Sequence, residues 1–211
     1  MAICGDNFLF IHMPKTGGMW ITCVLKYLTG NAYLLGAKHD SFPNLLIYGD
    51  PPFFEKKYTF VFVRHPIYWY MSRWAFRLKI DGWDMVHRLD YDCASNDFNQ
   101  FVRNIHEKYP NGWFDTEKKY FVDNVPRLDF VGRTEFLRQD MKKVLKDINV
   151  VDYCDVVDES VAVNDSDLDG MKSYDFAKYT RETMDMVLNS NEQFINKYYS
   201  DFELDEQSLL I

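Results

Sequence analysis

The fold is decided by the stretch Phe8-Leu-Phe-Ile-His-Met-Pro-Lys-Thr-Gly-Gly-Met-Trp20. Its first four residues are all apolar, which is typical of a strand that is covered on both faces, as in a parallel sheet. Apolar residues then recur at helical spacing, at Ile21, Val24, Leu25 and Leu28. Gly30 ends this pattern, because glycine is the usual residue just beyond a helix. The stretch therefore predicts a strand, a loop with two glycines and a helix.

The same order of elements recurs at Thr59-Phe-Val-Phe-Val63, an apolar and β-branched run that is followed by Arg64 and His65. Pro66 comes next, where the first residue of a helix belongs. Nothing breaks the helical segment before about Ile80. The sequence thus predicts a second buried strand that leads into a helix.

A third strand and helix are predicted further along the chain. The strand is Leu128–Val131, and Thr134 caps the helix that follows it. The apolar face of this helix consists of Leu137, Met141, Val144, Leu145 and Ile148. Further helices are predicted at about Asp97–Lys108 and at about Arg181–Tyr199. The alternation of strands and helices predicts an α/β fold, a single domain over residues 1–211 with a central parallel β-sheet flanked by helices.

Composition narrows the classes of partner. The chain has 24 Lys and Arg against 32 Asp and Glu, a net charge of −8, so a nucleic-acid partner is not expected. No apolar run approaches the ~20 residues of a membrane-spanning helix, and the start of the chain, with Asp6, does not match a secretory signal. The four cysteines are far apart, which indicates unpaired thiols in a reducing compartment. We therefore expect a cytoplasmic protein with no membrane partner.

The loop after the first strand has the residues of an anion site. Gly17 and Gly18 let the backbone approach a ligand, the helix N-terminus supplies partial positive charge, and Lys15 adds a full one. In a Walker A loop, the lysine follows the glycines and a neighbouring hydroxyl binds Mg²⁺. Here Lys15 precedes the glycines, which disfavours a magnesium–nucleotide site, and we predict no metal. The alternative is that the glycines only make a tight turn and Lys15 is a surface residue.

The second stretch places a cation at the end of a strand. Arg64 falls at the carboxyl end of a buried strand, where open α/β sheets bind their ligands. An arginine there is costly unless it meets an anion or a carboxylate. Ser72 lies eight residues further on and offers a hydroxyl group near the second turn of the helix. The alternative is that Arg64 pairs with an acidic side chain and Ser72 is solvated.

The two stretches together resemble the sulfotransferases that use 3′-phosphoadenosine 5′-phosphosulfate (PAPS). The order Pro-Lys-Thr-Gly-Gly-x-Trp, then Val-Arg-His-Pro with a serine eight residues after the arginine, is similar to the two cofactor motifs of that family. Residues Phe130–Asp140 and the tail Tyr198–Phe202 resemble segments of the carbohydrate sulfotransferases. The resemblance implies a P-loop NTPase-like sulfotransferase fold, PAPS as cofactor and adenosine 3′,5′-bisphosphate as product.

The resemblance also implies roles for single residues of the first loop. Lys15 would contact the bridging oxygen of the phosphosulfate and steady the leaving phosphate. Thr16, Gly17 and Gly18 would donate hydrogen bonds from loop N–H or hydroxyl groups. Met19 stands where the family usually has serine or threonine, so one hydroxyl contact to the 5′-phosphate should be missing.

Three more residues match positions that hold the nucleotide in that family. Arg64 and Ser72 would bind the 3′-phosphate, and Trp20 would stack on the adenine. For the acceptor, the resemblance implies a hydroxyl group, with a carbohydrate preferred because of the segment Gly132–Asp140. A glycan is therefore the expected partner beside PAPS.

A general base is needed to take the proton of the acceptor, and histidine is the natural candidate near neutral pH. His39 lies in a loop-rich segment between the two cofactor motifs. The resemblance to the carbohydrate sulfotransferases, several of which use a histidine there as the base, favours it, and Glu55 is the alternative. His12 and His65 adjoin the cofactor motifs and are expected to orient the backbone. Two other functions stay open: a P-loop nucleotide or small-molecule kinase, and a non-catalytic nucleotide-binding protein of the same fold.

Overall fold

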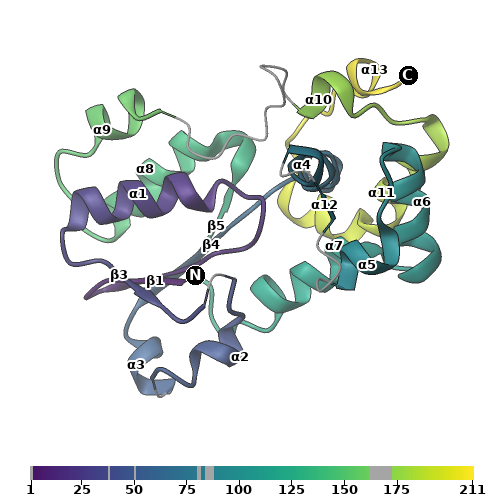
Figure 1. The fold of residues 1–211 in the computed structure, drawn as a ribbon. Coiled ribbons are helices and arrows are strands. Elements are labelled where there is room, and N and C mark those ends of the chain that lie inside the picture. Colours follow the sequence, from purple (N-terminus) through teal and green to yellow (C-terminus); the bar gives the residue numbers. More distant parts are fainter. Residues whose placement is uncertain (1, 38, 50, 80–81, 84–87, 162–172) are drawn as a thin grey trace. The chain divides into compact units, whose positions relative to one another are not determined.

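The computed structural model describes residues 2–37, 39–49, 51–79, 82–83, 88–161 and 173–211. Internal contacts fall into two compact units, residues 1–64 with 117–164 and residues 65–116 with 165–211. A single domain over residues 1–211 stays a prediction. The first unit contains a five-stranded sheet with the strand order β3-β1-β2-β4-β5 (Figure 1). Its strands are β1 Ala2–Cys4, β2 Phe8–Ile11, β3 Tyr33–Leu35, β4 Tyr58–Val63 and β5 Phe130–Arg133.

The sheet is mixed, so the prediction of a wholly parallel sheet is only partly correct. Strands β2, β4 and β5 are the three that the sequence predicts, and they run parallel to one another. Strand β1 pairs antiparallel with both β2 and β3. These two extra strands have three residues each, which is too short to show a period in the sequence. The α/β class is confirmed.

The core of the first unit lies between one face of the sheet and two helices, α1 Gly18–Thr29 and α8 Leu137–Asp147 (Figure 1). From the sheet it takes Ile3, Phe8, Phe10, Phe60 and Phe62. From the helices it takes Trp20, Ile21, Val24, Leu25, Met141, Val144 and Leu145. The predicted helix end is confirmed, because Gly30 adopts a left-handed conformation and its N–H donates to the Lys26 carbonyl.

The junction between β5 and α8 differs from the prediction. The strand begins two residues later than expected, and a 3₁₀ turn, Thr134–Phe136, precedes α8. Thr134 is not the helix cap, because it lies inside the 3₁₀ turn and the residue that precedes α8 is Phe136. Its hydroxyl donates to the carbonyl oxygen of Val63, 2.8 Å away, and so links the end of β5 to β4.

The second unit is helical, and α4, Pro66–Lys79, packs against three other helices of this unit. These are α6 Phe98–Lys108, α10 Ser173–Phe176 and α11 Arg181–Ser190. Helices α4 and α6 agree with the predictions. The long C-terminal helix is wrong in one respect, because it breaks at Asn191 into α11 and α12, Glu192–Tyr198.

The remaining helices are short. The first unit has α2 Phe42–Leu45, α3 Pro51–Glu55, a π-helical turn at Lys119–Asp123 and α9 Cys154–Glu159. The second unit has α5 Arg88–Cys93 and α13 Glu206–Leu209, while α7 spans Gly112–Lys118. No helix in the described part of the chain is both long and apolar enough to cross a membrane. All four cysteines are free.

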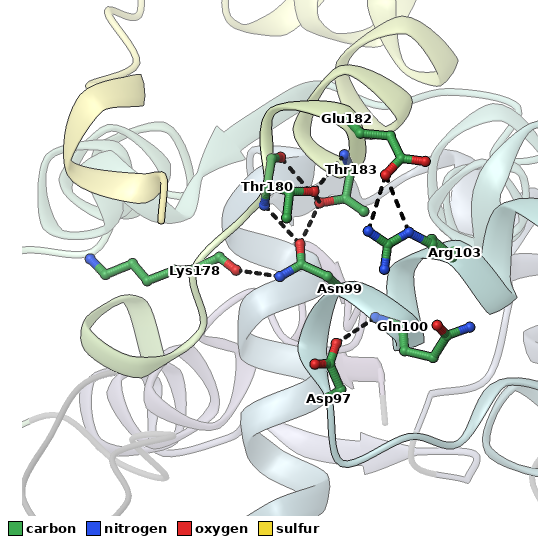
Figure 2. Close-up of polar contacts among 8 residues, drawn as sticks. All are labelled: Asp97, Asn99, Gln100, Arg103, Lys178, Thr180, Glu182 and Thr183. Atoms are coloured by element: carbon green, nitrogen blue, oxygen red, sulfur yellow. Dashed lines mark hydrogen bonds and ion pairs between the residues drawn. The ribbon is translucent and has the colours of Figure 1, made fainter.

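Asn99 joins α6 to the start of α11 (Figure 2). Its side-chain oxygen accepts hydrogen bonds from the N–H of Thr180, at 2.8 Å, and from the hydroxyl of Thr183. Its amide nitrogen donates to the Lys178 carbonyl at 2.9 Å. Thr180 is the N-terminal cap of α11. One buried amide therefore bonds to a carbonyl before this cap, to the N–H of the cap itself and to a hydroxyl after it.

Asn99→Ala should lower the free energy of unfolding by about 1–3 kcal/mol, because it leaves a donor and an acceptor unsatisfied inside the protein. The matched control is Arg103→Ala on the same helix. Arg103 pairs with Glu182 at 3.0 Å on the surface, where such pairs contribute only ~0–1 kcal/mol. Urea unfolding measures the free energy of unfolding of both variants. Equal decreases would show that the hydrogen bonds of Asn99 stabilise the protein no more than the surface ion pair does.

Candidate functional site

The parallel pairing of β2 with β4 brings the two predicted cofactor motifs to one edge of the sheet. In this register Ile11 lies opposite Val61, so the loop after β2 and Arg64 after β4 both emerge at the carboxyl edge. There, a guanidinium nitrogen of Arg64 donates to the carbonyl oxygen of Lys15 at 3.4 Å. The first motif and the arginine of the second motif therefore meet in space.

The loop from His12 to Gly17 has an unusual backbone. Lys15 and Gly17 adopt left-handed conformations, with φ of 67° and 77°. Thr16, which lies between them, is fully buried, and its hydroxyl donates to the Met13 carbonyl at 2.8 Å. Loops that pass through left-handed residues can gather backbone N–H groups around an anion. The Thr16 side chain closes the loop on itself, so only its backbone N–H could donate to a ligand.

Packing inside the protein requires glycine at positions 17 and 18, whether or not a ligand binds there. A Cβ on Gly18 would overlap the buried ring of His12. A Cβ on Gly17 would lie 3.1 Å from a methyl group of Leu137, at the start of α8, and would also be strained by the left-handed φ. The first turn of α1 holds no acidic residue, which leaves its N-terminus favourable for an anion. Met19 lies half-buried in this turn.

The prediction that Trp20 stacks on an adenine does not agree with its placement. The indole is only 3% exposed and belongs to the core beneath the sheet. Its N–H donates to the hydroxyl of Ser160 at 2.9 Å, and the Arg138 guanidinium lies 5.7 Å from the ring centre. Trp20 is therefore a core residue of α1 and is not exposed at the candidate site.

Ser72 lies on α4, in the second unit, and its side chain is buried. Arg64 contacts the loop through the Lys15 carbonyl. The contact of Ser72 with a 3′-phosphate stays a prediction. Arg133 is a basic residue that the sequence reasoning missed. It ends β5 opposite Val63, so it reaches the same carboxyl edge, and its guanidinium lies 4.3 Å from the Phe136 ring centre. The sequence predicts that this strand ends at Val131, so Arg133 was not expected at its carboxyl end.

His39 lies beside the loop. Its Nδ1 is 3.3 Å from the carbonyl oxygen of His12, and the two imidazole rings meet edge to face with centres 4.7 Å apart. Glu55, the alternative base, is exposed at the end of α3, just before β4 begins. That is the edge of the sheet opposite to Arg64, so Glu55 is not part of this site.

His65 caps α4. Its Nδ1 accepts a hydrogen bond from the N–H of Ile67 at 3.3 Å, and its carbonyl accepts from the N–H of Trp69. The ring packs against Tyr199 and Phe202, with centres 5.0 and 5.6 Å away. Burial lowers the pKa of His65 from 6.5 to about 4, so the imidazole is neutral at pH 7.

Two further observations bear on function. Among the described residues, no group of three or more His, Cys, Asp or Glu side chains is placed to hold a metal ion. No protein family, curated protein or solved structure matches this chain. A functional assignment therefore depends on the residues at this edge and on the resemblance of their motifs.

Lys15→Gly should give a more stable protein than Lys15→Ala, by about 1 kcal/mol, because glycine avoids the steric cost of the left-handed conformation. The matched control is Lys26 in α1, where the same two substitutions should have the opposite order, since glycine weakens a helix. Thermal or urea unfolding of the four variants decides this. If the two Lys15 variants are equally stable, the backbone is not strained there.

His65 should make stability fall in acid. Between pH 6.5 and about 4 the unfolded chain binds a proton that the folded His65 does not, so lowering the pH favours unfolding by up to about 3 kcal/mol. His65→Asn keeps a capping acceptor but cannot titrate. The difference in unfolding free energy between wild type and variant should therefore change across this range and stay constant above it. Parallel curves would contradict the lowered pKa.

Proposed function

We propose that this chain is a PAPS-dependent sulfotransferase that transfers the sulfuryl group to a hydroxyl acceptor. The observation that carries the proposal is the contact of Arg64 with the Lys15 carbonyl, because it unites the two motifs at one edge. The four free cysteines support a reducing compartment, the cytoplasm.

Transfer of a sulfuryl group needs positive charge beside the leaving phosphate and a base that takes the proton of the acceptor hydroxyl. Lys15 and the N-terminus of α1 supply the charge beside the 5′-phosphosulfate, and Arg64 binds the 3′-phosphate. His39 takes the proton of the acceptor hydroxyl while the hydroxyl oxygen forms a bond to sulfur. The bond from sulfur to the bridging oxygen breaks, and its electron pair leaves with adenosine 3′,5′-bisphosphate.

A carbohydrate is the acceptor that we propose, and its only support is the resemblance over Gly132–Asp140. These residues also have roles in the fold itself. A Cβ on Gly132 would lie 2.5 Å from the Phe62 ring, and the buried carboxylate of Asp140 accepts from the N–H of Arg133 at 2.8 Å. The segment therefore joins β5 to α8, whichever acceptor is used.

Calorimetry with adenosine 3′,5′-bisphosphate, and separately with ATP and Mg²⁺, tests the proposal. We expect the bisphosphate to bind at least about tenfold more tightly, since Lys15 precedes the glycines and no magnesium ligand follows them. A preference for ATP would support a kinase. Binding of neither nucleotide would reject the sulfotransferase.

Arg64→Ala should weaken binding of adenosine 3′,5′-bisphosphate by at least about tenfold, because a charged hydrogen bond contributes ~1.5–3 kcal/mol. Affinity for AMP, which lacks the 3′-phosphate, should change little. Arg127→Ala is the matched control, since Arg127 donates to the Glu55 carbonyl and pairs with Asp129 at the opposite edge of the sheet. If both nucleotides bind more weakly to the same degree, Arg64 supports the loop through Lys15.

A further inference from the structure

We infer that His12 is a positioning residue for His39. Its backbone carbonyl holds the proton of His39 on Nδ1, so that Nε2 carries the lone pair that a general base needs. The catalytic meaning of this inference rests on the proposed function. The arrangement of the two imidazoles does not depend on it, and it can be tested without a substrate.

The contact between the two residues selects one tautomer. A carbonyl oxygen can only accept a hydrogen bond, so the 3.3 Å contact with Nδ1 of His39 requires the proton on that nitrogen. In a neutral imidazole, the other nitrogen, Nε2, then has the lone pair. The edge-to-face contact of the two rings adds a second restraint on the orientation of His39.

His12 is itself held firmly by the core. Its ring is 3% exposed and stacks on Phe10, with centres 5.7 Å apart and planes 21° from parallel. Phe10 in turn stacks on Phe60 at 5.3 Å, within the core of the first unit. Gly18 gives the His12 ring its space, because any Cβ there would overlap it. The carbonyl that orients His39 therefore lies on a rigid strand end.

The loop that carries His39 has its own restraints. His39 adopts a left-handed conformation with φ of 73°. Asp40 closes the turn, since its carboxylate accepts from the N–H of Ala37 and its own N–H donates to the Ala37 carbonyl. Asp40 therefore bonds to the backbone of its own turn, and the His12 carbonyl contacts the imidazole at Nδ1.

Nitrogen-15 NMR of the imidazole rings of the full chain tests the tautomer directly. At alkaline pH, we expect His39 to carry its proton on Nδ1, with its signals assigned by their loss in His39→Gln. The chain offers two internal standards. His106 has Nδ1 3.0 Å from the Val102 carbonyl and should match His39, while His65 accepts at Nδ1 and should show the proton on Nε2. A His39 ring protonated on Nε2 would overturn the inference.

Two variants then separate positioning from folding. His12→Phe keeps an aromatic ring on Phe10 and keeps the carbonyl, so it should retain the Nδ1–H tautomer of His39 and kcat within about threefold. His12→Ala removes the support of the ring and should lower kcat by at least about tenfold, while affinity for adenosine 3′,5′-bisphosphate changes little. An unchanged kcat in His12→Ala, or an equal loss of kcat and of bisphosphate affinity, would overturn the positioning role. If the wild type does not bind the bisphosphate, the proposed function fails and the NMR result still decides the tautomer.

Discussion

The parallel pairing of β2 with β4 is the constraint on which the candidate site depends. Backbone hydrogen bonds set Phe10 opposite Phe60 and Ile11 opposite Val61, so the residues that follow both strands emerge at one edge. Because side chains alternate along a strand, a slip of one residue would turn Phe10 or Phe60 out of the core. It would also separate Arg64 from the Lys15 carbonyl. The stacked phenylalanines therefore fix the register that brings the residues of the candidate site together.

The glycines of the first loop illustrate how packing and ligand binding make the same demand. Gly18 must lack a Cβ for His12 to be buried, and Gly17 must adopt a left-handed conformation beside Leu137. A sequence pattern cannot separate these reasons from the approach of a phosphate, since all three select glycine. Lys15 is different, because a lysine in a left-handed conformation departs from the ordinary preference of its residue type. A residue whose conformation departs from the preference of its type is better evidence for a functional site than a residue that follows that preference.

The predictions from sequence succeeded where the pattern was long and failed where it was short or ambiguous. Helices α1 and α4 and the three parallel strands follow from periodicity and from Gly30 and Pro66. Strands β1 and β3, with three residues each, have no period to read. The resemblance implies that Trp20 stacks on the adenine, although Trp20 lies four residues before Val24 on the apolar face of α1. Helical spacing alone would have placed it in the core, as the structure does.

The histidines differ in the groups that contact Nδ1, and these contacts determine which ring nitrogen carries the proton. His65 uses Nδ1 as an acceptor to cap a helix, whereas Nδ1 of His39 faces a carbonyl oxygen 27 residues away in the sequence. Of the non-glycine residues with positive φ in the described chain, Asn149 and Asp152 have side chains that tolerate that conformation. The other two are Lys15 and His39, the two residues that the sequence predicts to be catalytic. Local strain persists where the surrounding structure holds it, often at functional sites. Lys15 lies in the loop after β2 and His39 in the turn after β3, and Nδ1 of His39 contacts the carbonyl oxygen of His12 at the start of the first loop.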